Sequence, residues 1–260
     1  GVDLYVTYVN QTQLDALRLA APQPNWTLDQ FLELAVKMNY PEGLPQDASK
    51  RLFGYCTGLD SFDAIVLIYL RGGQIVDDLD TPRKAFLDDV RTIEALEWYR
   101  SAEAQRQGAC GAWFGLYSER GGGSTPWTFQ WLMLPLPRDR VSISAAELEG
   151  YYIAQACEHP KEAMQLIHFL SGRWEAAGRL APPRRSLATD RAFAKAVGND
   201  VAAVAANAPN NLLMIPYELS PGLERVGGAL LQVIQRVIAE DLDPGPLLRE
   251  AQRRVAPTLQ

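Results

Sequence analysis

The feature that most constrains the fold of this chain is the alternation of short apolar segments of strand type with longer segments of helical periodicity. The strand-type segments are "ACGAWFG", "TFQWLML" and "YYIAQA". Helical segments precede and follow these strand-type segments and outnumber them. Because parallel strands are usually joined through helices, this order predicts an α/β fold in which helices pack over a largely parallel sheet.

The predicted helices are marked by their ends and by their apolar faces. Thr27 and Gln30 form a capping box at the start of "NWTLDQFLELAVKM". The apolar run "SFDAIVLIYL" reads as a buried helix that ends at Gly72-Gly73, although periodicity alone does not distinguish it from a strand. The other predicted helices cover an amphipathic segment from Pro82 to about Gln107, "HPKEAMQLIHFLSG" with Ala163, Leu166, Ile167 and Leu170 inward, 190–208, 222–240 and 244–255. The prolines of "APPRRSLA" predict a loop.

Composition and charge narrow the class of protein. With 47% hydrophobic and 22% charged residues, the chain is typical of globular proteins, and it contains no apolar run long enough for a membrane span. A formal charge of -6 argues against a nucleic-acid partner, which would require a basic face. The three cysteines cannot all pair with one another, and the apolar surroundings of Cys110 and Cys157 predict buried thiols, so the redox compartment stays open.

The motifs of the common enzyme and metal-binding families are absent from the sequence. His159 and His168 do not have the spacing of a zinc site, and the triple glycine Gly121–Gly123 is not followed by the lysine of a phosphate-binding loop. The clustered aspartates at 77–80 and 88–89 lack the glycine and the spaced glutamate of a calcium-binding loop. We therefore expect no catalytic residues, no metal and no cofactor.

The stretch "GAWFGLYSERGGGSTPWTFQWLMLPLP" places three tryptophans, a tyrosine and a triple glycine between two predicted strands. Aromatic rings stack on the C–H faces of sugars, and glycine lets backbone approach a ligand closely. The competing interpretation is a packed core. Trp113 and Phe114 lie within one strand, so at least one of them is expected in the core, and Trp131 on the next strand is expected there too.

The order of the segments resembles the family 1 extracellular solute-binding proteins, the substrate-capture subunits of bacterial ABC importers. The segments that carry this resemblance are, in order, "YVTYVNQTQLDAL", "WTLDQFLELAVKM", "IYLRGGQIVDD", "AWFG…FQWLMLPLP", "GYYIAQACEHPKEAMQLIHFLSG" and "APPRRSLA". Each segment alone is a weak signal, but together they extend over essentially the whole chain. The resemblance implies non-catalytic binding of a polar solute, above all a carbohydrate, in a cleft between two lobes.

The same resemblance implies a domain layout, a partner and a location. Residues 1–149 and 204–260 would form the second lobe of a type II periplasmic-binding-protein fold, and 150–203 would be a short helical excursion into the first lobe. Most of that first lobe, which family members carry before the first strand, is not in this sequence. The implied partners are the membrane subunits of an ABC importer, and the implied location is extracellular or periplasmic, with a possible lipid anchor. No charged-then-apolar leader follows Gly1, so a secretory signal is expected to be removed or to lie upstream.

The residues expected to contact the solute come from several segments. The family pattern assigns Tyr117 to the cleft, and Trp127 is either a stacking platform there or a lid on its own loop. Trp113 is a further candidate, subject to the competing core interpretation. By the family pattern, Asp60 and Phe62 precede a buried helix where a relative presents a carboxylate and a stacking ring.

Three further candidates lie where the chain is expected to cross between the lobes. Tyr151 begins the predicted crossing strand and is expected to face the solute, whereas Tyr152 is expected to point the other way. Arg184 and Arg185 could donate to hydroxyl or acidic groups, and at least one of the two is expected to be solvated. Gly227-Gly228 stand where relatives carry aromatic residues, which implies a solute other than a maltose-like one.

Two other functions stay open at this stage. The chain could be a ligand-sensing or scaffold domain of a larger signalling protein, which a neighbouring kinase or DNA-binding domain would indicate. An enzyme acting on glycosides ranks last, because it needs two carboxylates facing each other across a cleft and the sequence identifies no such pair.

Overall fold

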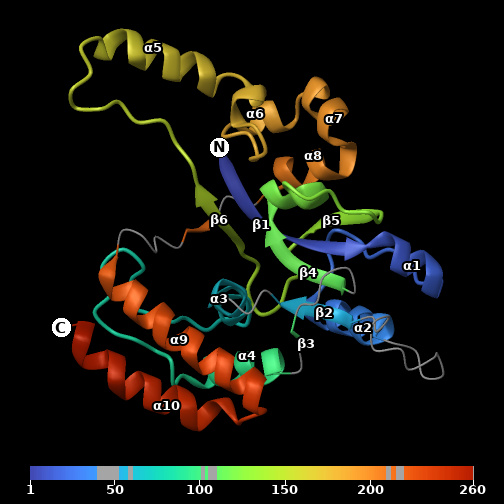
Figure 1. The fold of residues 1–260 in the computed structure, drawn as a ribbon, viewed down its shortest axis with the longest axis vertical. Helices are drawn as coiled ribbons and strands as arrows, with labels where there is room; N and C mark the ends of the chain where they lie inside the picture. Colours follow the sequence, from blue (N-terminus) through green and yellow to red (C-terminus); the bar gives the residue numbers. More distant parts are fainter. Residues whose placement is uncertain are drawn as a thin grey trace.

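The structure is a computed structural model that describes residues 1–39, 53–57, 61–100, 103–104, 110–208, 212–214 and 220–259. Within these residues, seven strands form one sheet in the order β3-β2-β4-β1-β6-β7, and β5 also pairs with β1 (Figure 1). The strands are β1 (Val2–Asn10), β2 (Phe53–Thr57), β3 (Glu103–Ala104), β4 (Cys110–Leu116), β5 (Trp131–Pro135), β6 (Ser144–Leu148) and β7 (Leu212–Met214).

All of these strands except β1 run in the same direction. β1 is antiparallel to β4, β5 and β6, while β2 is parallel to β3 and β4, and β6 is parallel to β7. The expected α/β fold with a mostly parallel sheet is therefore confirmed. As a result, the carboxyl ends of the other strands lie toward the edge of the sheet where β1 begins.

The helices of the described residues agree with most of the predicted segments. They are α1 (Gln11–Leu17), α2 (Leu28–Met38), α3 (Ser61–Leu70), α4 (Val90–Arg100), α5 (Pro160–Ser171), α6 (Arg185–Ala188), α7 (Arg191–Val197), α8 (Asn199–Ala206), α9 (Pro221–Glu240) and α10 (Pro244–Val255). The capping box of α2 is present, with the Thr27 hydroxyl accepting from the Gln30 amide and the Gln30 side chain accepting in return. Ser220 and Asp243 cap α9 and α10 in the same local manner, which is why these ends could be predicted from sequence.

Each face of the sheet has its own apolar core, because successive side chains of a strand point to opposite faces. Tyr5 and Val9 of β1 belong to the larger core, which also contains apolar side chains of α2, α3, α9 and α10. Leu4, Val6 and Tyr8 belong to the second core, which contains side chains of α7 and α8. Figure 1 shows α9 and α10 on one side of the molecule and α7 and α8 on the other.

Three predicted elements differ from the structure. "YYIAQA" is not a strand, since residues 151–156 have no ladder partner, and the strand of this region is β6, upstream at Ser144–Leu148. The helix expected from Pro82 to about Gln107 is shorter at both ends. It begins at Val90, after an antiparallel bridge between Val76 and Ala85, and ends at Arg100, before Glu103–Ala104 pair with β2 as strand β3. The predicted loop "APPRRSLA" contains the short helix α6.

Helix α5 forms where it was predicted but buries no side chain. Of the side chains predicted to point inward, Leu166 is 57% exposed and Ala163, Ile167 and Leu170 are only half-buried, so the described residues do not bury this face. Figure 1 shows α5 standing away from the rest of the molecule.

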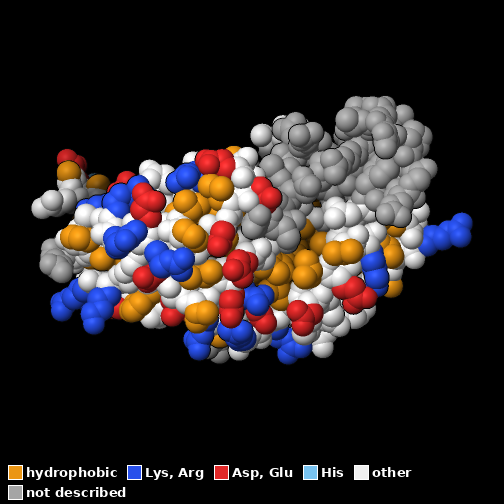
Figure 2. All heavy atoms as spheres, turned by 90° about the horizontal axis from the view of Figure 1, so that it is seen from below, with side chains coloured by type: hydrophobic (Ala, Val, Ile, Leu, Met, Phe, Trp, Pro, Cys, Tyr) orange, Lys and Arg blue, Asp and Glu red, His pale blue; other side chains and the backbone are white. Residues whose placement is uncertain are grey.

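The surface of the described residues carries charges of both signs. Figure 2 views the molecule from the α10 side, where lysine, arginine and acidic side chains are interspersed rather than separated into areas of one sign. No helix in the described ranges has both the length and the apolar character needed to cross a bilayer.

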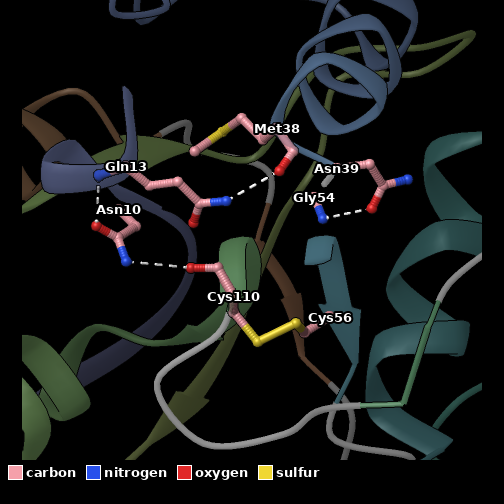
Figure 3. Close-up of a disulfide and its surroundings, with 7 residues drawn as sticks. All are labelled: Asn10, Gln13, Met38, Asn39, Gly54, Cys56 and Cys110. Atoms are coloured by element: carbon pink, nitrogen blue, oxygen red, sulfur yellow. Dashed lines mark hydrogen bonds between the residues drawn. A yellow bond between two sulfur atoms is a disulfide. The ribbon is translucent and has the colours of Figure 1, made fainter. Parts of the chain in front are cut away.

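Cys56 and Cys110 form a disulfide that joins the neighbouring strands β2 and β4 (Figure 3). The expectation of a buried free thiol at Cys110 is therefore wrong. The two cysteines are separated by 54 residues in sequence, and only the pairing of the two strands brings them together. Cys157 is a free, half-buried thiol.

Candidate functional site

The candidate site lies along the edge of the sheet where the parallel strands end, which we call the carboxyl edge. It comprises the turn Tyr117–Gly122 after β4, residues 149–151 after β6, and the start of β1. Val2 and Ala181 exchange backbone hydrogen bonds of 3.0 and 2.8 Å, which brings the segment leading to Arg184 and Arg185 to the same edge. Open α/β sheets bind ligands outside the carboxyl ends of their strands, so a ligand is expected at this edge.

Tyr117 follows β4 directly and its side chain is fully buried in the second core. Its hydroxyl oxygen lies 3.5 Å from the carbonyl oxygen of Val201 on α8, and the guanidinium of Arg120 lies 4.7 Å from the centre of its ring. Burial raises the pKa of Tyr117 to about 12. Tyr117 thus lies at the carboxyl edge with its ring buried, and contact between this ring and a solute stays a prediction.

Two arginines that sequence reasoning missed join two segments at this edge. Arg120 donates to the carbonyl oxygens of Tyr117, at 3.1 Å, and of Arg179. Arg179 donates in return to the carbonyl oxygens of Ser118, at 2.6 Å, and of Arg120. Burial is the main reason that the pKa of Arg120 is lowered. These bonds fix the turn after β4 against the chain that precedes Ala181.

Asp3 completes this arrangement from β1. It is 3% exposed, and its carboxylate accepts a hydrogen bond of 2.9 Å from the backbone N–H of Ser118. Residues of β1, of the turn after β4 and of the 179–181 segment are thus held together. Because these residues are far apart in sequence, no local signal could have identified them.

The remaining predicted residues lie at different depths. Tyr151 is 54% exposed, and its hydroxyl donates to the carbonyl oxygen of Ala176 at 3.2 Å. Arg184 and Arg185 are both exposed, and Arg185 donates to the carbonyl oxygen of Ala208 at 3.0 Å. Asp60 lies outside the described residues, and Phe62 belongs to α3 but its side chain is not described.

The three tryptophans of the 111–137 stretch pack together with Tyr8 in the second core, whereas Phe114 belongs to the larger core on the other face of the sheet. Trp113 is 7% exposed and stacks on Tyr8 with ring centres 5.5 Å apart. Trp127 is half-buried and presents an edge-on contact to both rings, at 5.2 Å from Trp113 and 5.0 Å from Tyr8. Trp131 joins the cluster 5.6 Å from Trp127. The expectation that at least one of Trp113 and Phe114 belongs to the core is confirmed, since both are buried.

The triple glycine allows the loop to turn back onto this cluster. Gly121, Gly122 and Gly123 have φ values of 70°, 96° and 59°, a region that favours glycine. A Cβ on Gly122 would lie 2.7 Å from the backbone nitrogen of Trp127. Glycines and large rings therefore occur together because the loop has to pass very close to the tryptophan that it packs against the sheet.

No group of three or more histidine, cysteine, aspartate or glutamate side chains in the described part of the chain could hold a metal ion. The polar groups at the carboxyl edge are instead guanidinium, phenol and carboxylate groups with backbone partners. Groups of this kind can hydrogen-bond to hydroxyl-rich solutes and orient them.

Burial of Tyr117 predicts a loss of stability at alkaline pH. The pKa of the phenol is about 10.0 in the unfolded chain and about 12 in the folded state. Above pH 10 the unfolded chain therefore loses this proton while the folded protein keeps it, which favours unfolding. The stability that is present below pH 10 is lost as the pH rises toward the folded pKa. We expect Tyr117 to account for about 1 kcal/mol of lost unfolding free energy between about pH 9 and about pH 11. Urea unfolding of the wild-type protein and of Tyr117→Phe at both pH values measures this difference. An equal pH dependence in the two proteins would contradict it.

This chain resembles known proteins in its structure rather than in its sequence. No protein-family model matches the sequence, and no curated protein matches it. Among solved structures, the chain resembles UgpB from Mycobacterium tuberculosis in complex with glycerophosphocholine, with a TM-score of 0.76 and 14% identity over 99% of this chain and 69% of that chain. It also resembles an ABC substrate-binding protein from Listeria monocytogenes in complex with cycloalternan, with a TM-score of 0.74 and 13% identity over 99% and 70% of the two chains.

A third similar structure is an ABC transporter solute-binding protein from Thermotoga lettingae bound with α-D-tagatose. The TM-score is 0.72 and the identity is 16%, over 100% of this chain and 71% of that chain. Alignment of nearly the whole chain confirms the fold that the order of segments implied. The chain therefore has the fold of the ABC transporter solute-binding proteins, and it spans about 70% of the length of the structures that it resembles.

Proposed function

We propose that this chain binds a polar small solute, of the carbohydrate or polyol class, and passes it unchanged to the membrane subunits of an ABC importer. The observation that carries this proposal is the likeness to solute-binding proteins along essentially the whole chain. Similar structures include complexes with cycloalternan, tagatose, mannobiose and ribitol. The solute would lie against the carboxyl edge, where Tyr151 and Arg184 are exposed.

The same proposal explains why helix α5 buries none of its side chains. We propose that one lobe contains the sheet and that the part of 150–203 that includes α5 crosses to a second lobe. The rest of the expected excursion, α7 and α8, stays with the sheet, because its apolar side chains belong to the second core. The motivating observation is that α5 buries no side chain and that Leu166 and Phe169, neighbours on one side of this helix, are 57% and 55% exposed. An apolar face of this kind normally packs against another element. A solute held between two lobes gains contacts only in the closed state, so binding would favour closure.

The disulfide supports a location outside the cytosol. Stable disulfides form and persist in oxidising compartments such as the periplasm and the cell surface. Cys56 and Cys110 are both buried, at 0% and 6% exposure, so their bond belongs to the folded interior. An extracellular or periplasmic solute-binding protein fits this chemistry.

Replacing Tyr151 tests the position of the solute. We expect Tyr151→Ala to weaken solute binding about tenfold, because loss of one aromatic contact costs about 1.4 kcal/mol. The matched control is Tyr152→Ala, which removes a neighbouring ring that is 92% exposed. Isothermal titration with the solute that binds best to the wild-type protein measures both affinities. Equal affinities for the two variants and the wild-type protein would place the solute elsewhere.

A further inference from the structure

A second candidate site is an open hollow of about 570 Å³ beside the start of β5. Its volume is within the range of roughly 300–1,000 Å³ that is usual for small-molecule sites. The residues that line it are Thr12, Asp15, Trp127, Thr128, Phe129 and Gln130. They come from α1 and from the loop that leads into β5.

The hollow and the carboxyl edge lie toward opposite ends of β1. Asn10 at the end of β1 pairs with Trp131, next to the hollow, whereas Val2 at the start of β1 pairs with Leu148 at the carboxyl edge. A strand advances about 3.4 Å per residue, so these two pairs are separated by about 27 Å. A solute at one end therefore cannot occupy the other.

Two aromatic rings line the hollow, and buried aromatic residues pack against them. Trp127 and Phe129 are both half-buried and stack with ring centres 5.7 Å apart at an angle of 11°. The buried rings of Tyr8 and Trp113 contact Trp127 edge-on, and Trp113 also contacts Phe129 at 6.1 Å. Because this aromatic surface is fixed by packing, a ligand would not have to order it on binding.

The polar groups of the hollow can both accept and donate hydrogen bonds. The Thr12 hydroxyl accepts from the Gln130 backbone N–H at 3.0 Å, which leaves its own proton to donate. One oxygen of the exposed Asp15 carboxylate accepts from the Gln11 side chain at 2.5 Å, and the carboxylate has further acceptor capacity. The side chains of Thr128 and Gln130 are exposed as well.

We propose that this hollow binds one neutral pyranose unit of a saccharide. The C–H face of the sugar would lie on the aromatic surface, while its hydroxyl groups would donate to Asp15 and accept from Thr12. Asp15 is the charged residue among the six that line the hollow, so an anionic sugar would be disfavoured. This site goes beyond the proposed function, because it adds a saccharide contact outside the interlobe cleft.

The test is amide chemical-shift mapping of the full chain by NMR with three probes, methyl α-glucoside, methyl α-mannoside and methyl β-galactoside. We expect at least one probe to shift the amides of residues 12–15 and 127–130 in a saturable manner. We expect Asp15→Ala to weaken that binding at least about fivefold, since hydrogen bonds to an ionised carboxylate are stronger than those between neutral groups. The matched control is Asp29→Ala, which removes another exposed helical carboxylate, in the first turn of α2, and should leave the shifts unchanged.

The outcomes separate this inference from the proposed function. Saturable shifts confined to the carboxyl edge would overturn the second site and leave the proposed function standing. Shifts around the hollow that Asp15→Ala does not weaken would also overturn it. The absence of shifts near the hollow with all three probes would likewise overturn the second site. Shifts near the hollow without shifts at the carboxyl edge would support the second site but not the proposed function.

Discussion

Gly54→Ala is expected to destabilise the folded protein by at least about 4 kcal/mol, which is a large loss of unfolding free energy for the addition of one methyl group. Gly54 lies in β2 where this strand passes directly beneath α2. A Cβ at this position would lie 1.6 Å from the carbonyl oxygen of Ala35. The clash is with backbone, so no side-chain rotation relieves it, and α2 would have to move away from the sheet.

That movement would also break a hydrogen bond. The Gly54 backbone N–H donates to the Asn39 side chain at 2.8 Å, at the end of α2 (Figure 3). Urea unfolding followed by circular dichroism measures the loss of stability. The matched control is Gly228→Ala, at an exposed position within α9 where an added Cβ meets nothing within 4 Å. This control should gain about 0.5–1 kcal/mol, because alanine is the better helix former. Equal stability of the two variants would contradict the close approach of α2 and β2.

Loss of the disulfide is expected to lower the unfolding free energy by about 4 kcal/mol. The bond closes a loop with a sequence separation of 54 residues, and by the chain-entropy account it stabilises the fold by restricting the unfolded chain. The double variant Cys56→Ala/Cys110→Ala removes the bond without leaving a buried thiol. Urea unfolding of this variant, compared with the oxidised wild-type protein, measures the contribution of the bond.

Two controls make this measurement specific. A reducing agent should destabilise the wild-type protein but have little effect on the double variant. Cys157→Ser should change stability by less than about 1 kcal/mol, because Cys157 is a half-buried free thiol on an irregular segment. A double variant as stable as the oxidised protein would show that the two sulfur atoms are not bonded in solution.

The parts of the fold that could be predicted from sequence are those with local signals. The capping box of Thr27 and Gln30 predicted the start of α2 because both partners lie within four residues of each other. The same holds for α9 and α10, whose apolar periodicity and terminal proline and aspartate signals are continuous in sequence. The α/β class followed from the order of such segments.

The parts that could not be predicted depend on contacts between distant segments. The bond between Cys56 and Cys110 follows from the pairing of β2 with β4, and the Arg120–Arg179 contacts follow from the approach of two separate turns. "YYIAQA" has the composition of a strand but no neighbouring strand to pair with, and the actual strand lies a few residues upstream at β6.

The aromatic stretch 111–137 was predictable in part, because its composition is a local signal but the burial of each ring depends on distant segments. Its composition indicated either a core or a sugar-binding surface, and the structure packs Trp113 into the core while it leaves Trp127 half-buried beside a hollow. The left-handed glycines at 121–123 serve the packing of this loop. Which solute contacts the carboxyl edge depends on side chains from several segments, and Asp60 lies outside the described residues.

The central claim is that the chain binds a hydroxyl-rich solute and does not transform it. Isothermal titration of the protein against a panel of monosaccharides, oligosaccharides and polyols is the decisive measurement. We expect saturable binding of at least one member, and chromatography should show that the recovered solute is unchanged. Absence of binding across the panel, or recovery of a cleaved or modified solute, would show that the chain is not a binding protein for such solutes.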